Sequence, residues 1–364
     1  MNTTARIWPR LAAFAAAAIV VQLSLSAVGK VYYLTQLTMA VYYSIVVMGL
    51  SLLMGYAGQV SLGQGAFFAI GGYTSAFLTT HNMAGYRGAA WFDLLDKCGV
   101  IVSRKSLYDD TLVLTVAPWL AFMVAILLTV VIAAVIGYPS LRLRGHYLAM
   151  ATLGFGLIIH CVLIGSPALG AADGITGVPR LSVGGLAVSG KSAVRVQNYY
   201  IAWAVAIAVL VLLRNLVESR MGRALRAIHD SEAAASAMGV NTPKLKLEVF
   251  MVSAALAAMA GSLLTHYNEG IGPSESSAFK SVRYLALVAA GGVANLEGAL
   301  VVSTLLVFLS LRGWFGTYDN AVFGIILIAI VALAPQGPFR QLGLWMGRCR
   351  TLYKPGKEAR SGAS

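Results

Sequence analysis

Ten apolar runs separated by short polar linkers constrain this chain more than any other feature of its sequence. Six are close to the ~20 residues that an α-helix needs to cross a bilayer, and four are shorter. The long runs lie at about 11–28, 32–54, 112–137, 146–165, 199–217 and 246–266, and the shorter ones at about 64–80, 282–293, 297–311 and 319–335. Composition agrees, because only 11% of the 364 residues are charged, against about 25% in soluble domains. The runs predict an all-α polytopic membrane protein with about nine or ten transmembrane segments, some broken or re-entrant.

Lysine and arginine residues outside these runs predict the orientation of the chain. They collect near the amino terminus, in the linker 218–247 and in the tail, which share one face when the chain crosses ten times. The other face receives the linkers 81–111 and 166–198, where basic residues are diluted over long segments. The positive-inside rule therefore predicts that both termini and the linker 218–247 are cytosolic.

The first apolar run can also be read as a signal peptide, with Ser24, Leu25 and Ser26 as the cleavage site. We favour a retained anchor, because another apolar run begins only a few residues later. The chain then forms one transmembrane domain over residues 1–340, followed by a basic cytosolic tail, 341–364, of disordered composition.

The charged and reactive residues exclude several classes of function. The net charge of +13 does not indicate nucleic-acid binding, because the bases lie in linkers rather than in one patch interleaved with aromatic residues. Cys98, Cys161 and Cys349 are too few and too scattered for a disulfide framework or a zinc site. The five histidines lack metal-binding spacing, and no paired carboxylates converge within a span, so we predict neither a metal site nor membrane-embedded catalysis.

One stretch matches a nucleotide-binding pattern, since residues 185–192, GLAVSGKS, fit G-x-x-x-x-G-K-[S/T]. A phosphate-binding loop needs a buried strand before it, a helix after it and a parallel sheet to hold both. The segment of about 33 residues between two spans leaves no room for that sheet, and it lies on the face opposite the basic linkers. We therefore predict that the chain has no ATPase site of its own.

The linker 218–247 is the longest polar, helix-forming stretch between two apolar segments. Apolar residues recur in its first part at helical spacing, with basic residues on the other faces, which predicts a short amphipathic helix. These apolar residues are Met221, Leu225 and Ile228. A second short helix follows, with Asp230 as its cap and Gly239 as its end. Helices this short are marginal in water, so they either pack on their own membrane domain or dock into a groove of a partner.

Two apolar regions, 49–65 and 285–301, contain clusters of glycine and polar residues at membrane depth. Irregular backbone is tolerated there only where protein buries it or where it lines a water-filled cavity, so we predict a translocation pathway nearby. Close helix packing through small residues is the alternative explanation. The candidate pathway residues are Gly55, Gly58, Gln59, Ser61, Gly63, Gln64, Gly154, Gly156, Gly291, Gly292, Asn295 and Glu297.

Six stretches resemble the inner-membrane permeases of branched-chain amino acid ABC importers. They are GLSLLMGYAGQVSLGQGAFFAIGGYTSAFL (49–78), LRLRGHYLAMATLGFGLII (141–159), ADGITGVP (172–179), GRALRAIHDSEAAASAMGVN (222–241), AAGGVANLEGAL (289–300) and APQG (334–337). The chain is most similar to the larger of the two permease subunits, and urea and short-amide importers use similar chains. The resemblance covers about residues 35–340.

The resemblance implies that the linker 218–247 holds the segment that such permeases insert into a groove of a cytosolic ATPase. The residues that match this coupling motif are Glu232, Ala234, Ala235 and Gly239, and we add Arg223 and Arg226 from the preceding helix. Leu157 and His160 depart from the family pattern, which commonly has glutamate and arginine there, so no polar role is assigned to them.

The resemblance also implies a set of partners and a location. The partners are two cytosolic ABC ATPase subunits that carry the ATP and magnesium, a second, related permease subunit, and a periplasmic solute-binding protein. The chain would lie in the lipid of a bacterial inner membrane, hold no cofactor, and pass branched-chain amino acids or similar small polar solutes into the cytoplasm.

An ion-coupled secondary carrier of amino acids is the main alternative function. Such carriers hold their coupling ion with buried carboxylates. Glu297 is the one candidate here, because Glu248 and Glu269 lie near the ends of spans. Glu297 fits the role of a helix-end cap equally well. A membrane-embedded enzyme or a scaffold is a further alternative, without converging reactive groups to support it. The solute stays open between a branched-chain amino acid, another amino acid, urea and an amide.

Overall fold

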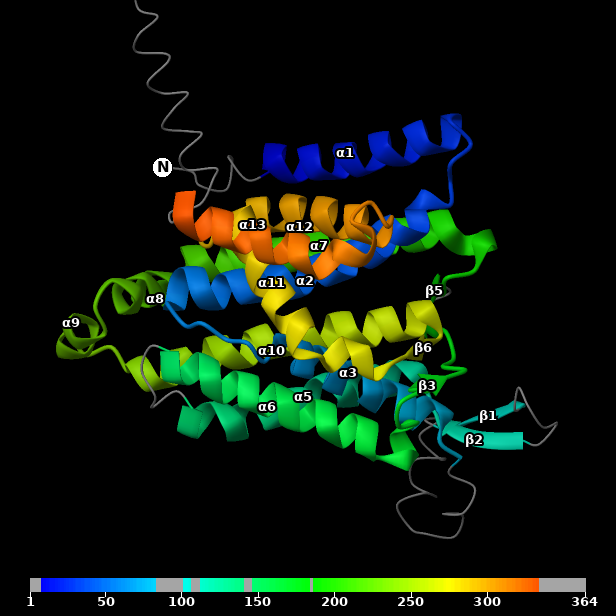
Figure 1. Cartoon of the computed structure of the whole chain (residues 1–364), viewed down its shortest axis with the longest axis horizontal. Helices are drawn as coiled ribbons and strands as arrows, with labels where there is room; N and C mark the ends of the chain where they lie inside the picture. Colours follow the sequence, from blue (N-terminus) through cyan, green and yellow to red (C-terminus); the bar gives the residue numbers. More distant parts are fainter. Residues whose placement is uncertain (1–7, 83–100, 106–111, 141–145, 184–185, 334–364) are drawn as a thin grey trace, which may run out of the picture.

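The computed structural model describes residues 8–82, 101–105, 112–140, 146–183 and 186–333. Within them each predicted apolar run contains a helix, although the first residues of the run 112–137 form a strand, Leu112–Val116 (Figure 1). These helices are α1 (Trp8–Ala27), α2 (Tyr33–Ala57), α3 (Gln64–Thr80), α5 (Pro118–Ser140), α6 (His146–Gly165), α7 (Arg195–Glu218), α10 (Thr242–Asn268), α11 (Ala278–Gly291), α12 (Leu296–Leu311) and α13 (Asp319–Leu333). Among the described helices, α2, α5, α6, α7 and α10 are long and apolar enough to cross a bilayer. The prediction of an all-α polytopic membrane protein is therefore confirmed.

Helix α2 forms the centre of the bundle. Its most apolar window is 83% buried, against 22% for α6 at the edge, so α2 is surrounded by protein and α6 offers most of its surface to the outside. Gly49 of α2 allows close packing on α10, where a Cβ would lie 3.4 Å from Leu256. On another side, Ser44 Oγ lies 2.8 Å from Thr304 Oγ1 of α12. Helices far apart in sequence therefore meet on α2.

Helix α11 is too short to span the membrane. Its 14 residues measure about 21 Å at 1.5 Å per residue, whereas the hydrocarbon core is about 30 Å thick. The strand β6 (Gly270–Ile271) and the 3-10 turn η5 (Pro273–Ser276) lead into it from the end of α10. Ser277 caps α11 by accepting a hydrogen bond from the Lys280 backbone N–H. The helix thus begins four residues before the predicted run 282–293, and the segment before it re-enters the bundle.

The two ends of the bundle carry different structure (Figure 1). One end holds α8 (Arg220–Asp230) and α9 (Glu232–Ala237). The opposite end holds three small antiparallel pairs: β1 (Ile101–Lys105) with β2 (Leu112–Val116), β3 (Ile175–Thr176) with β6, and β4 (Leu181–Val183) with β5 (Leu186–Val188). The tail 341–364 and most of the linker 81–111 lie outside the described residues, so the predictions for them stay predictions.

The stretch that matches a nucleotide-binding pattern has an arrangement unlike a phosphate-binding loop. Its described part, residues 186–192, contains β5, which pairs with β4 in an antiparallel hairpin, and then enters η4 (Ser192–Val194). A phosphate-binding loop joins a strand of a parallel sheet to a helix. Gly185, the first residue of the pattern, lies outside the described residues.

Candidate functional site

Helix α8 has the predicted amphipathic form. Ser219 caps it, since its side chain accepts a hydrogen bond from the Met221 N–H at 3.1 Å. Leu225 and Ile228 are buried against the membrane domain, as their spacing predicted. Arg223 on the other face is exposed. The helix is therefore pinned to its own domain along one side and open on the other.

Helix α9 follows after a single residue, and the predicted cap was wrong by one position. Asp230 is the last residue of α8, so it cannot leave the helical conformation to cap the next helix. Ser231 has an extended backbone and its Oγ accepts from the Ala234 N–H at 3.3 Å. At the other end Gly239, with φ +84°, turns the chain so that the Val240 N–H reaches the Ala235 carbonyl at 3.1 Å.

The predicted coupling residues have different surroundings. Glu232 forms an ion pair with Lys246 of α10, at 2.6 Å, which ties the first turn of α9 to the membrane domain. Ala235 is buried against that domain. Ala234 and Gly239 are exposed, and Met238 beside them is 84% exposed. The segment therefore presents a small-residue surface with one large apolar side chain, on a rigidly held turn.

The first break, residues 58–63, joins α2 to α3 and touches α8 and α6. Gly58 ends α2 with φ +66°, and a Cβ there would lie 3.0 Å from His229 Nδ1 of α8. On the other side, the Leu62 N–H donates to Thr152 Oγ1 of α6 at 2.9 Å. The break thus connects the α8–α9 end of the molecule to two of its membrane helices.

The polar residues of the first break are buried. Ser61 is fully buried, and its Oγ accepts from the Gly63 N–H at 3.4 Å. Gln64 begins α3 and donates to Ser253 Oγ of α10 at 3.0 Å. Gln59 is buried, and neither of its amide atoms has a hydrogen-bond partner among the described residues. Buried amides without partners are costly, so this break has capacity for a further polar contact.

The second break, residues 292–295, packs directly on the end of α2. A Cβ on Gly55 would lie 2.1 Å from the Val293 carbonyl oxygen, so only glycine fits there. Ser51 Oγ donates to the same carbonyl at 2.9 Å, and Tyr56 OH donates to the Ala294 carbonyl at 2.9 Å. The second break and the end of α2 that leads into the first break, far apart in sequence, therefore lie side by side.

The remaining glycine candidates divide between packing and open surface. A Cβ on Gly298 would lie 2.3 Å from the Gly291 carbonyl oxygen, so this pair brings α11 close to α12. Asn295 caps α12, since its Oδ1 accepts from the Gly298 N–H at 3.0 Å. On α6, no described residue lies within 4 Å of a Cβ on Gly154, and a Cβ on Gly156 would reach the Leu62 carbonyl oxygen only at 3.8 Å. The structure therefore does not bring Gly154 to the breaks, whereas Gly156 faces the first one.

A cavity of about 230 Å³ lies between α7, α8 and the second break. Its wall holds the ion pair between Arg214 Nη1 and Glu297 Oε1, at 2.6 Å. Glu297 lies in the first turn of α12, where the helix dipole also favours an anion. Arg226 of α8 lines the same cavity and lies over the Tyr56 ring, 5.8 Å from its centroid. The cavity thus joins helix α8 to the second break and to the end of α2.

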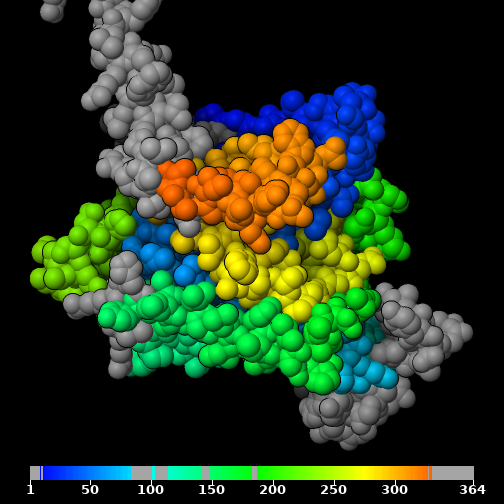
Figure 2. Space-filling view, in the orientation of Figure 1, coloured from blue at the N-terminus to red at the C-terminus, as the bar shows by residue number. Residues whose placement is uncertain are grey.

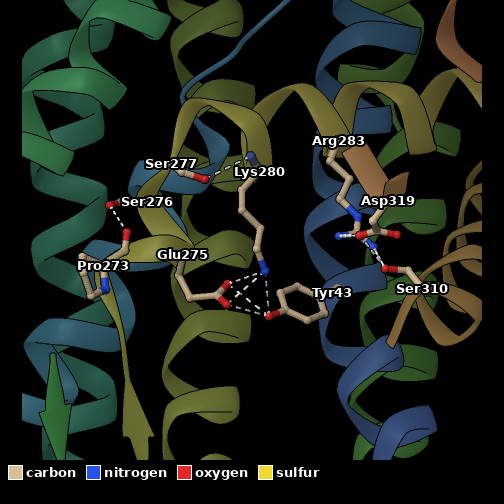
Figure 3. Close-up of polar contacts among 9 residues, drawn as sticks. All are labelled: Tyr43, Pro273, Glu275, Ser276, Ser277, Lys280, Arg283, Ser310 and Asp319. Carbon is tan, nitrogen blue, oxygen red and sulfur yellow. Dashed lines mark hydrogen bonds and ion pairs between the residues drawn. The ribbon is translucent and has the colours of Figure 1, made fainter. Parts of the chain in front are cut away.

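Two further ion pairs, which the sequence did not indicate, lie along α11 (Figure 3). Lys280 Nζ is 3.0 Å from Glu275 Oε1 of η5, and Arg283 Nη1 is 2.9 Å from Asp319 Oδ2 at the start of α13. Glu275 and Lys280 fall between the predicted runs 246–266 and 282–293, whereas Arg283 lies inside the second of them. The available signal was Ser277 as a helix cap, which would have brought Lys280 into the helix as well. Among the described residues, no group of histidine, cysteine or acidic side chains is arranged to hold a metal ion.

Comparisons with known proteins agree on one family. The family model for the branched-chain amino acid transport system permease component matches residues 32–331. The high-affinity branched-chain amino acid transport system permease protein LivM of Salmonella typhimurium is 27% identical over 321 residues, which cover 82% of this chain and 68% of that protein. The permease protein LivH of the corresponding Escherichia coli system is 25% identical over 324 residues, covering 84% and 95%. No solved structure matches the chain at a comparable level.

Proposed function

The chain belongs to the permease family of branched-chain amino acid ABC transport systems, and from this premise we propose that it passes branched-chain amino acids or similar small polar solutes into the cytoplasm. As a permease subunit of an ABC importer, it differs in kind from the ion-coupled carrier that was the main alternative. Relatives of both the LivM and the LivH type match it, which supports a second, related permease as its partner.

The observation that carries the proposal is the α8–α9 linker. It is held to the membrane domain through Leu225, Ile228 and the Glu232–Lys246 ion pair, yet it leaves the surface around Ala234 and Met238 open. A rigidly held turn with an open face suits a docking element that transmits force. We infer that this face enters a groove on an ATPase subunit.

The route from this linker to the pathway follows the contacts of the first break. Movement of α8 would act on Gly58 through His229, and on the second break through the cavity that Arg226 and Glu297 share. Both breaks have short irregular backbone between helices, which can shift at lower cost than a continuous helix. The glycine breaks would then open and close the pathway as the ATPases close on ATP.

The other parts of the proposal follow from the division of labour in such an importer. Two cytosolic ATPase subunits would bind the ATP and magnesium, so this chain needs no nucleotide site or cofactor of its own. A periplasmic binding protein would deliver the solute to the end that carries the β-strands. The α8–α9 end, with both termini, would then face the cytosol of a bacterium whose inner membrane holds the chain.

A docking variant tests the proposal. The double substitution Glu232→Lys with Gly239→Pro should abolish both co-purification of the ATPase and ATP-driven uptake into proteoliposomes, because it reverses an anchoring charge and removes the left-handed turn. Lys244→Gln, whose side chain in the same linker is largely exposed, is the matched control and should retain both. Unchanged uptake in the double variant, or uptake by the chain alone driven by a sodium or proton gradient, would contradict the proposal.

A further inference from the structure

The ion pair between Glu275 and Lys280 lies near the middle of the membrane-spanning part of the bundle. Lys280 Nζ is 3.0 and 3.1 Å from the two carboxylate oxygens of Glu275, and the Tyr43 hydroxyl lies 2.9 Å from Glu275 Oε1 and 3.2 Å from Lys280 Nζ (Figure 3). Tyr43 is about 15 Å along α2 from its first residue, Tyr33, so the pair lies well within the spanning part of that helix. Ionisable groups at such depth are rare and typically serve function.

The pair can be reached from outside the chain. The side chains of Glu275 and Lys280 are 17% and 23% exposed, and the neighbouring Phe279 is exposed. The part of the chain that contains α11, drawn in yellow, forms surface between α13 and α6 (Figure 2). Charges open to lipid at this depth would be costly. The open side of the pair therefore faces water or another protein.

Two helix N-termini meet beside this pair. The Gly65 N–H in the first turn of α3 donates to Ser281 Oγ in the first turns of α11, at 3.2 Å. Each N-terminus carries a partial positive charge, and Lys280 adds a full one. Such a field favours a carboxylate, and the N-termini of interrupted helices bind solute carboxylates in other transporters. Glu275 supplies that carboxylate in the conformation described.

Two buried phenols near the pair have spare hydrogen-bonding capacity. The hydroxyl oxygens of Tyr73 and Tyr284 have no hydrogen-bond partner among the described residues. Tyr73 lies on α3, whose first turn is bonded to α11, and the Tyr284 ring lies 6.3 Å from that of Tyr43, measured between centroids. An unsatisfied buried hydroxyl is costly, and the charged groups of a ligand would satisfy it.

The second ion pair of α11 is a fixed brace by comparison. Arg283 is bonded to Asp319 and to Ser310, and its guanidinium lies over the Phe323 ring, 4.1 Å from the centroid. Three elements, α11, α12 and α13, thus hold it. Glu275 instead stands on a four-residue turn. One partner of the Glu275–Lys280 pair therefore stands on a short turn, whereas both partners of the Arg283–Asp319 pair stand on helices.

We propose that Glu275 and Lys280 form a binding site for the charged ends of a zwitterionic amino acid, with Glu275 taking the α-ammonium and Lys280 the α-carboxylate. The inference rests on the proposed function and narrows its solute class. When Glu275 and Lys280 separate, each loses its oppositely charged partner. A bound zwitterion supplies one positive and one negative group in their place, so the site stays neutral throughout. Urea and simple amides cannot make this exchange, which places amino acids ahead of them as solutes.

The test measures binding of radiolabelled leucine to the full complex of both permeases and ATPases in nanodiscs, without the binding protein. Two competitors each lack one charge: 4-methylpentanoate has no ammonium, and 3-methylbutylamine has no carboxylate. The wild-type complex should prefer leucine to either one, and to urea, by roughly tenfold or more, as expected for one lost charge-assisted hydrogen bond. Equal binding of urea and leucine, or no leucine binding, would overturn the proposal.

Variants of the two charged residues should each lose a different selectivity, which a purely structural role of the pair would not produce. Glu275→Gln should weaken leucine binding by roughly tenfold and bring it level with 4-methylpentanoate, whereas Lys280→Met should bring leucine level with 3-methylbutylamine. The control is Arg283→Met with Asp319→Asn, which removes the other ion pair of α11 and should leave selectivity unchanged.

The outcomes separate this inference from the proposed function. Wild-type leucine affinity and selectivity in both Glu275→Gln and Lys280→Met would show that the pair is only a brace and would overturn the inference, while ATP-driven uptake would still support a permease. Loss of selectivity in the Arg283 control as well would also overturn it. Absence of ATP-driven uptake of any amino acid by the wild-type complex would instead contradict the proposed function.

Discussion

The two glycine breaks resemble each other in sequence but differ in packing. The second break is tight, because Gly291 and Gly298 bring two backbones together and Asn295 caps the next helix. The first break touches side chains from α8 and α6, and the two amide atoms of Gln59 within it have no hydrogen-bond partner in the described part of the chain. Glycine therefore serves close packing in one break and backbone freedom in the other, which makes the first break the better candidate for the part that moves.

The largest expected effect lies where the second break packs on the end of α2. Gly55→Ala would place a Cβ 2.1 Å from the Val293 carbonyl oxygen, so the backbones must separate, and we expect a loss of about 3 kcal/mol in the free energy of unfolding. Chemical unfolding in mixed micelles measures it. Gly154→Ala is the control, since no described residue lies within 4 Å there, and it should be neutral or stabilising. Equal stability of the two variants would refute the direct contact between the second break and α2.

A smaller effect should come from the ion pair that ties the second break to α7. Arg214→Met removes the guanidinium 2.6 Å from Glu297, and we expect about 2 kcal/mol of destabilisation, less than for a fully buried pair because the side chains are 20% and 29% exposed. Adding Glu297→Gln should restore most of that stability. A double-mutant cycle with no coupling energy would show that electrostatics do not hold this break.

In the first break, the free energy of unfolding should depend more on the backbone conformation at Gly58 than on the packing around it. Gly58→Ala must hold φ near +66° and should cost about 1–2 kcal/mol in the free energy of unfolding. Gly58→Asn meets His229 just as closely but tolerates the left-handed conformation, so it should cost less. Thermal unfolding compares the two variants. Equal losses would attribute the effect to the His229 contact instead.

The smallest effect on stability is expected at Gln59, although its effect on transport should be clear. Gln59→Met removes two unpartnered amide atoms, so the free energy of unfolding should stay level or rise by up to about 1 kcal/mol. ATP-driven uptake should fall, because the substitution removes a polar side chain from the break that is proposed to move when the pathway opens and closes. Normal uptake in this variant would favour the same packing role for the first break as for the second.

The sequence predicted where the helices lie, but not which residues of different helices contact one another. Apolar runs near the length of a span located the helices, because membrane thickness fixes that length. Two features escaped: Ser231 rather than Asp230 caps α9, and Lys280 lies inside a helix that starts before its apolar run. The contact of Gly55 with Val293 was also invisible, since the pairing of spans depends on shapes formed by residues about 240 positions apart.

The central position of α2 has a consequence for the synthesis of the protein. Its hydrogen bond from Ser51 goes to a carbonyl 242 residues later, and the bond between Ser44 and Thr304 spans 260 residues. At ordinary translation rates these partners emerge roughly 10–50 s after α2 itself. Thr38 and Ser44 bond back to carbonyls of their own helix, at 2.7 and 2.8 Å, so their hydroxyls are satisfied even in lipid. Helix α2, the most buried of the candidate spans in the folded protein, must therefore first lie exposed in lipid. The hydroxyls of Thr38 and Ser44 are hydrogen-bonded in both surroundings.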